Sequence, residues 1–188
     1  MEVFERNMRI LLVSALPEEV QGMPYEVTLT GVGKINATRV LTEKIVMWDG
    51  RKPMLPDIVI NYGTAAKCSN KVEVGELYEI GSYIQRDMNV TQLGFENYQT
   101  PFGKGTINGG KGDLVCATGD NFWEGDTQFT EEYDVADMEA YALASVCETY
   151  KIPFRCFKYI SDDGDAKQWE QNCRKGVELF IARMRLNA

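Results

Sequence analysis

The chain has 188 residues, of which 44% are hydrophobic and 11% aromatic, so it can bury one substantial core but is too short to form two comfortably. Its 28 acidic and 20 basic residues give a net charge of −8, which argues against a nucleic-acid groove or an anionic membrane surface as the partner. The absence of histidine excludes histidine bases, triads and metal sites, so acid-base chemistry must come from carboxylates, Lys, Tyr or Cys.

The cysteines and the N-terminal segment indicate where the protein resides. The five cysteines show no CxxC spacing, and most lie in apolar surroundings, as reduced core cysteines do. Residues 1–7 carry two glutamates and no apolar run, and the chain has no apolar stretch long enough for a membrane span. The sequence therefore predicts a cytoplasmic protein with one domain at 1–188, in which residues 1–7 form a frayed extension.

Hydrophobic periodicity predicts strands and helices in alternation along the chain. Strands are expected at 8–14, 25–30, 57–61, 114–118 and 154–160, with two more at 72–87 joined by a glycine bend that curls the sheet towards a barrel. Helices are expected to begin near Pro17 and to cover 35–47, 139–150 and 168–186, and a loop at 89–101 precedes a flexible glycine-rich connector at 102–113. This order predicts an α/β fold with a central twisted, mixed but mostly parallel sheet flanked by helices.

Two carboxylates flank the helix and strand predicted between 139 and 160. Twelve helical residues cover roughly 18 Å and seven strand residues roughly 23 Å, so the chain returns near the level at which it left. Glu139 and Asp162 are therefore expected at the carboxyl edge of the sheet, where open parallel sheets bind ligands. The pattern also allows a structural interpretation, in which Glu139 favours a helix N-terminus and Asp162 begins a turn.

Five segments resemble the nucleoside phosphorylase and nucleosidase superfamily, and most closely its 5'-methylthioadenosine/S-adenosylhomocysteine nucleosidases. They are SALPEEV at 14–20, GVGKINA at 31–37, NYGTAA at 61–66, the pair DMNVTQLGF at 87–95 and ATGDNFW at 117–123, and ADMEAYALASVC at 136–147 with ISDDGD at 160–165. The resemblance implies a nucleoside phosphorylase-like fold and hydrolysis of the N-glycosidic bond of an adenine nucleoside. It also implies that no cofactor and no metal take part.

The resemblance divides the catalytic roles between two carboxylates. Asp162 would donate a proton to N7 of the departing base, and Glu19 would hold and deprotonate the attacking water. This chemistry needs an acid behind the leaving group and a base across the sugar ring, because the sugar passes through an oxocarbenium-like transition state. An aspartic acid at N7 also suits a 6-aminopurine, since it can donate to N7 and accept from the exocyclic amine.

The resemblance also implies a set of residues that bind the substrate. Glu139 would bind the ribose hydroxyls, while Met138 packs against the sugar. Phe122 would stack on the purine, and the backbone of Trp123 would bind its Watson–Crick edge. The remaining substrate-binding residues expected at this edge are Thr64, Ala65, Ala66 and Ser161.

The residues at two positions favour hydrolysis over phosphorolysis. Phosphorylases of this superfamily place an arginine at the position of Asn61, whereas Asn61 and Glu19 supply no positive charge for a phosphate. The GVGK turn at 31–34 lacks the spacing of a phosphate-binding glycine motif. A phosphate-dependent purine nucleoside phosphorylase and a catalytically silent nucleoside-binding domain remain the alternatives.

The chain departs from the family pattern around the pocket for the 5' substituent. Only ten residues, 21–30, separate Val20 from the GVGK turn, and the connector at 102–113 replaces a helix. Arg86 stands where the family has a histidine, and Leu93 replaces a phenylalanine that lines the 5' pocket. Because family members form dimers, Leu93 and Phe95 are expected to serve the partner chain, and the 5' substituent stays open.

Overall fold

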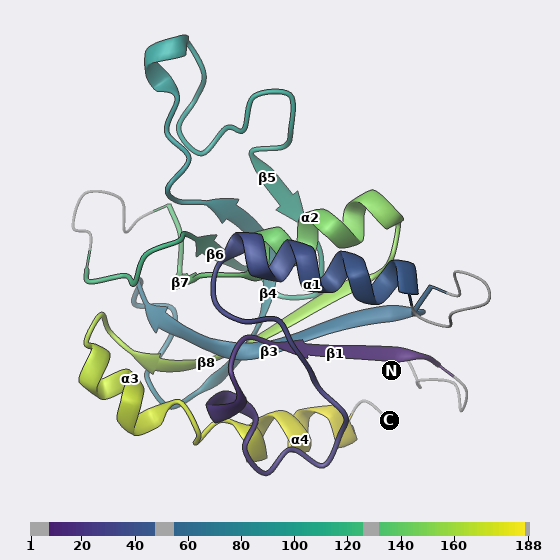
Figure 1. Ribbon diagram of the computed structural model, residues 1–188. Coiled ribbons are helices and arrows are strands. Elements are labelled where there is room, and N and C mark those ends of the chain that lie inside the picture. The colour runs from purple at the N-terminus through teal and green to yellow at the C-terminus, as the bar shows by residue number, and fades with distance from the viewer. Residues whose placement is uncertain (1–7, 48–54, 126–131, 187–188) are drawn as a thin grey trace.

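The computed structural model describes residues 8–47, 55–125 and 132–186 (Figure 1), so the extension predicted at 1–7 lies outside the described residues. The strands are β1 (Ile10–Ser14), β2 (Thr28–Leu29), β3 (Ile58–Lys67), β4 (Leu77–Gln85), β5 (Thr106–Asn108), β6 (Leu114–Thr118), β7 (Val135–Asp137) and β8 (Phe154–Asp162). The helices are α1 (Lys34–Met47), α2 (Ala140–Tyr150), α3 (Ala166–Asn172) and α4 (Val177–Leu186), with 3-10 turns η1 (Pro17–Val20) and η2 (Thr91–Leu93). None of these described helices has the length and apolar character needed to cross a membrane.

The strands form one mixed sheet in which five pairings are parallel and three antiparallel. The strands β3, β7, β6, β4 and β8 pair in turn, and β8 returns to β3, so these five strands close a ring. Closure leaves few unpaired strand edges. Helices α1 and α2 lie on one side of the sheet and α4 on the other (Figure 1). The predicted fold class, a single α/β domain with a mostly parallel sheet flanked by helices, is confirmed.

Alternation along β3 divides the core between the two sides of the sheet. Val59 and Ala65 belong to the cluster that packs with α1 and α2, whereas Ile60 and Tyr62 pack with Phe180 of α4. Because successive side chains of a strand point to opposite faces, this continuous apolar run is buried on both sides. The strand predicted at 57–61 is correct and continues to residue 67, which carries β3 into the carboxyl edge of the sheet.

Glycines explain where the sequence predictions for 72–113 were wrong. Instead of two strands there is one, β4, with a register shift at Gly81, where a Cβ would lie 1.7 Å from the carbonyl oxygen of Gly112. The connector at 102–113 contains β5, which pairs with β4. A Cβ on Gly112 would lie 1.9 Å from the carbonyl oxygen of Glu79, so these glycines allow the connector to pack closely against β4.

Three further elements differ from the prediction. The strand expected at 25–30 is reduced to the two residues of β2, and β7 was not predicted because three residues give too short a pattern. The closing helix is broken into α3 and α4. At Gly176, between them, a Cβ would lie 2.4 Å from Cγ of Tyr159, so the chain passes too close to β8 for any side chain there.

Candidate active site

A cavity of about 430 Å³ lies where the ends of β3, β7 and β8 meet the segments that follow β1 and β6. The predicted edge is therefore correct, because Glu139 and Asp162 both line this cavity. Of the residues predicted from the sequence, those that line it are Glu19, Thr64, Ala65, Ala66, Phe122, Trp123, Met138, Glu139 and Asp162. Segments far apart in the sequence thus meet at one site.

Asp162 ends β8 and is only 1% exposed. Its Oδ2 accepts a hydrogen bond from the hydroxyl of Ser161 at 2.7 Å, and its Oδ1 accepts one from the backbone N–H of Gly164 at 3.0 Å. Burial raises the pKa of Asp162, although these two hydrogen bonds oppose the rise. The side chain is therefore held in a fixed position and retains a proton more readily than an exposed aspartate.

Glu19 reaches the same cavity from η1 and is also buried. Its Oε1 accepts from both the backbone N–H and the hydroxyl of Thr64, at 2.8 and 2.7 Å. Its Oε2 accepts from the Ser14 hydroxyl at 3.2 Å and from the Leu16 N–H at 3.1 Å. These four donors from three segments place a carboxylate beside the end of β3.

Glu139 lies directly before α2, and its Oε1 accepts a hydrogen bond from the Gly33 N–H at 2.8 Å. Burial, and then the nearby charge of Asp137, raises the pKa of Glu139 to about 8. Asp137 also contacts the start of α2, because its Oδ2 accepts a hydrogen bond from the backbone N–H of Ala140 at 2.8 Å. The carboxyl group of Glu139, at the N-terminus of α2, therefore binds a proton more tightly than an exposed glutamate does.

Lys158 is a buried cation next to the site that the sequence interpretation missed. Its Nζ lies 2.8 Å from Oδ2 of Asp137, and both side chains are almost completely buried. Lys158 pairs in register with Gly63 on β3, and a Cβ on Gly63 would lie 3.4 Å from both Lys158 Nζ and Glu19 Oε1. The lysine thus lies beside Gly63 of β3 and reaches Asp137 on β7, the other strand that pairs with β3.

A signal for Lys158 exists in the sequence. A lysine within the apolar strand predicted at 154–160 cannot remain charged inside a core without a counter-charge. Burial opposes the charge of Lys158, but Asp137 outweighs it and raises the pKa of Lys158 well above its usual value. Burial likewise raises the pKa of Asp137, but Lys158 lowers it to a net value below the usual one, so the pair is ionised.

The wall formed by residues 121–123 combines an aromatic ring with an anchored indole. Phe122 is half-buried and lines the cavity. Trp123 is buried, and its Nε1–H donates to the Tyr133 hydroxyl at 3.3 Å. The indole bulk is therefore accommodated in the core cluster beside β6 and β7.

Two other residues at the site have supporting contacts. Trp169 of α3 lines the cavity and donates its Nε1–H to the hydroxyl of Thr64 at 3.0 Å, a contact that was not predicted from the sequence. Ser161 does not line the cavity but holds Asp162. In the described part of the chain, no group of three or more acidic or cysteine side chains could hold a metal ion.

Comparison with known proteins finds no matching family profile but several similar proteins. The 5'-methylthioadenosine/S-adenosylhomocysteine nucleosidase of Actinobacillus succinogenes is 28% identical over 79% of this chain and 72% of its own length. The solved structure of futalosine hydrolase from Helicobacter pylori has a TM-score of 0.80 with 15% identity, covering 95% of this chain and 97% of that chain. The Helicobacter pylori 5'-methylthioadenosine/S-adenosylhomocysteine nucleosidase bound to butyl-thio-DADMe-Immucillin-A has a TM-score of 0.80 with 16% identity, covering 96% and 99%.

The chain is a homologue of these nucleosidases and has the nucleoside phosphorylase/nucleosidase fold. The resemblance found in the sequence is thereby confirmed.

In this nucleosidase homologue, Leu93 and Phe95 do not line the cavity of their own chain. They lie at and beside η2, in a segment that projects away from the sheet (Figure 1). Leu93 is 73% exposed. Their expected role at a partner chain stays a prediction.

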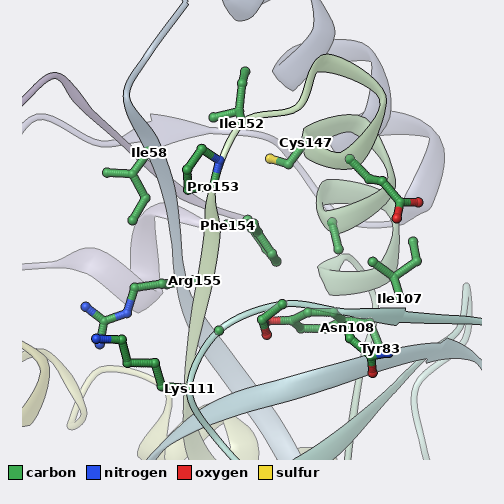
Figure 2. Close-up of a pocket in the computed structure, with 14 residues that line it drawn as sticks. Ile58, Tyr83, Ile107, Asn108, Lys111, Cys147, Ile152, Pro153, Phe154 and Arg155 are labelled. Atoms are coloured by element: carbon green, nitrogen blue, oxygen red, sulfur yellow. The ribbon is translucent and has the colours of Figure 1, made fainter.

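A second cavity of about 430 Å³ lies beside the start of β8 and the C-terminal half of α2. Figure 2 shows Ile58, Phe154 and Ile107 around it, with Arg155 and Lys111 together on one side. The Arg155 guanidinium is already paired with Glu79, whose two carboxylate oxygens accept at 2.8 Å each. Glu148 is the one carboxylate among the described residues that line it, so this cavity does not bring two carboxylates together as the first one does.

Proposed function

We propose that the protein is a purine nucleosidase that hydrolyses the N-glycosidic bond of an adenine nucleoside, namely 5'-methylthioadenosine, S-adenosylhomocysteine or a related purine nucleoside. One observation carries the proposal: two buried carboxylates, Asp162 and Glu19, come from separate elements into one cavity. Nucleoside hydrolysis needs an acid and a base that act on opposite partners of the broken bond. The nucleosidase homologues support the same activity.

In the proposed mechanism Asp162 is the acid and Glu19 the base. The bond between C1' and the base nitrogen breaks as the carboxyl proton of Asp162 passes to N7. Water adds to C1', and its proton passes to Glu19, so one water is consumed and free base and free sugar leave. The raised pKa of Asp162 suits the acid role, because burial makes the protonated form of this carboxyl group easier to keep.

The proposed binding roles are those that the resemblance implies, and the positions of these residues around the cavity support them. Glu139 binds the ribose hydroxyls, with Met138 against the sugar, and Phe122 stacks on the purine while the backbone of Trp123 meets its edge. The other contacts come from Thr64, Ala65 and Ala66, and Ser161 acts through Asp162.

Phosphorolysis is the second candidate, and the composition of the cavity argues against it. None of the described residues that line the cavity is Arg or Lys. Lys158 lies close by, but its ammonium group is paired with Asp137. Asn61 is buried within the sheet, where its amide donates to the carbonyl oxygen of Val13 at 3.2 Å. A phosphate dianion would therefore lie beside carboxylates, with no free cation among the described lining residues to bind it.

Assembly and location are part of the proposal. We infer a homodimer in which the exposed Leu93 and the half-buried Phe95 of one chain approach the site of the other, which sedimentation of the purified protein would test. All five cysteines are free and buried, which supports a reducing cytoplasmic location.

The deciding experiment incubates the protein with 5'-methylthioadenosine, S-adenosylhomocysteine, adenosine or futalosine, with and without phosphate. We expect free base and free sugar to appear without phosphate. A requirement for phosphate would identify a phosphorylase, and binding without turnover would identify a silent nucleoside-binding domain. The rates with the four nucleosides would also define the 5' substituent.

Glu139→Gln should stabilise the fold at about pH 8, by a margin that shrinks towards about pH 5. The pKa of Glu139 is about 8 in the folded protein, whereas an unfolded glutamate titrates at about 4.3. Between these values the folded state binds the proton more tightly, so ionisation of Glu139 beside Asp137 and Glu19 lowers stability as pH rises. Glutamine mimics the protonated group and removes this cost. Thermal unfolding of both proteins at the two pH values measures the margin.

The same substitution should weaken nucleoside binding at about pH 8 and above, where Glu139 is partly or fully ionised, because glutamine cannot bind the ribose hydroxyls as a carboxylate does. A variant that is more stable but binds its ligand more weakly is typical of a substitution at a charged functional site. An unfolding-temperature difference that is equal at the two pH values would contradict the titration of Glu139 in this range.

A further inference from the structure

The base-contacting wall of residues 121–123 has no regular secondary structure of its own. It follows β6 directly, and its position therefore depends on side chains from other elements. Besides the hydrogen bond from Trp123 to Tyr133, such contacts come from Arg86 and Asp87, which directly follow β4. The mechanism above gives neither residue a role.

The guanidinium group of Arg86 donates hydrogen bonds to both the side chain and the backbone of Asn121. Its Nη1 donates to Oδ1 of Asn121 at 3.0 Å, and its Nη2 donates to the carbonyl oxygen of the same residue. The Arg86 backbone N–H donates to the carbonyl oxygen of Thr118 at 2.9 Å. A Cβ on Gly119 would lie 2.7 Å from Cζ of Arg86, so the guanidinium lies against the bare backbone of Gly119.

Asp87 extends these contacts to the turn that holds Glu139. Its Oδ2 accepts from the Asp120 N–H at 2.9 Å, and its Oδ1 accepts from Nζ of Lys34. The Lys34 N–H donates in turn to Oδ1 of Asp120 at 2.8 Å. The preceding residue, Gly33, donates to Glu139 at 2.8 Å. The wall of residues 121–123 and the carboxyl group of Glu139 are thus both connected by hydrogen bonds to the Gly33–Lys34 turn.

Arginine suits this position for a physical reason. Its planar guanidinium presents several donors in a fixed geometry, so it can engage the side-chain and backbone oxygens of one residue at once. A lysine offers a single compact ammonium group, and methionine, a neutral side chain of similar length, offers no donor. The two contacts to Asn121 are charge-assisted, which makes them stronger than neutral hydrogen bonds.

We propose that Arg86 is a positioning residue for base recognition, which fixes the wall of residues 121–123 against the end of β4 and, with Asp87, couples it to the Gly33–Lys34 turn. This inference rests on the proposed function, in which the wall contacts the purine. Asp162 and Glu19 are held by Ser161, Gly164 and Thr64, outside this network. Loss of Arg86 should therefore affect substrate binding more than the chemical step.

The test compares Arg86→Met and Arg86→Lys with Arg39→Met, a control in which an exposed arginine loses its helix-surface partner Glu43. Hydrogen bonds to a charged group contribute about 1.5–3 kcal/mol, so KM for the nucleoside should rise about tenfold to hundredfold in Arg86→Met, while kcat changes little. Arg86→Lys should recover only part of this loss. An unchanged KM in Arg86→Met, or equal losses in kcat and stability with no separate rise in KM, would overturn the proposal.

A second measurement does not depend on turnover. Hydrogen exchange of the amides of residues 119–125 should be faster in Arg86→Met than in wild type and in Arg39→Met, and adenine should bind more weakly by calorimetry. Unchanged exchange in this segment would overturn the inference even if the protein is an active nucleosidase. If the wild type released no base, the proposed function would fail, whereas faster exchange in Arg86→Met would still support the positioning role.

Discussion

Asp162→Asn should reduce the rate of base release by about 10² to 10⁴, which corresponds to roughly 3 to 5 kcal/mol of lost transition-state stabilisation. Asparagine has nearly the shape of aspartic acid but has no carboxyl proton to give to N7. The fold should be unaffected, because the amide oxygen can still accept from the Gly164 N–H and the Ser161 hydroxyl can turn to accept from the amide.

The measurement is adenine release under single-turnover conditions, together with nucleoside affinity and the unfolding temperature. Asp163→Asn is the matched control, since it removes the same charge from an exposed neighbour and should leave the rate comparable to wild type. Near-normal release by Asp162→Asn would remove Asp162 from the acid role. A fall in unfolding temperature would instead indicate a structural role.

Lys158→Met should destabilise the protein by about 3–5 kcal/mol, because it leaves Asp137 buried without its counter-charge. For a domain of this size the unfolding temperature should fall by roughly 6–20 °C. The loss should shrink as pH falls towards about 4, since Asp137 in the variant can then become neutral by binding a proton. Thermal unfolding across this pH range measures both effects.

Two further variants separate this explanation from simple loss of packing. Lys104→Met breaks an exposed pair with Glu148 and should cost no more than about 1 kcal/mol. The double variant Lys158→Met with Asp137→Asn removes both buried charges and should recover part of the lost stability. If the double variant is no more stable than Lys158→Met, the uncompensated charge is not the cause.

The buried charges also explain why this site is costly to form. Glu19, Asp137, Glu139 and Asp162 are at most 7% exposed, with Lys158 as a buried cation beside them. Bringing carboxylates together inside a protein separates their proton affinities, as the raised pKa of Glu139 and the lowered pKa of Asp137 show. Such separation lets one site supply both a proton donor and a proton acceptor.

Elements with a long and strong hydrophobic periodicity were predictable from the sequence. Elements whose position depends on two chain segments packing closely at a glycine were not. The strand of β6, the helix α2 and the strand of β8 occur where hydrophobic periodicity predicts them. The single strand β4, the pairing of β5 and the break before α4 depend on Gly81, Gly112 and Gly176. At these positions a neighbouring chain leaves no space for a side chain, and one sequence read alone does not reveal that neighbour.

The sequence by itself determined the α/β class, the edge shared by Glu139 and Asp162, and the resemblance to nucleosidases, because each depends on periodicity or on local motifs. Only the tertiary structure decided which charges meet. Lys158 reaches Asp137 because β8 and β7 both pair with β3, and Arg86 reaches Asn121 because β4 and β6 end at the same edge. Both contacts join residues distant in sequence, and their free energy depends on burial that only the folded chain provides.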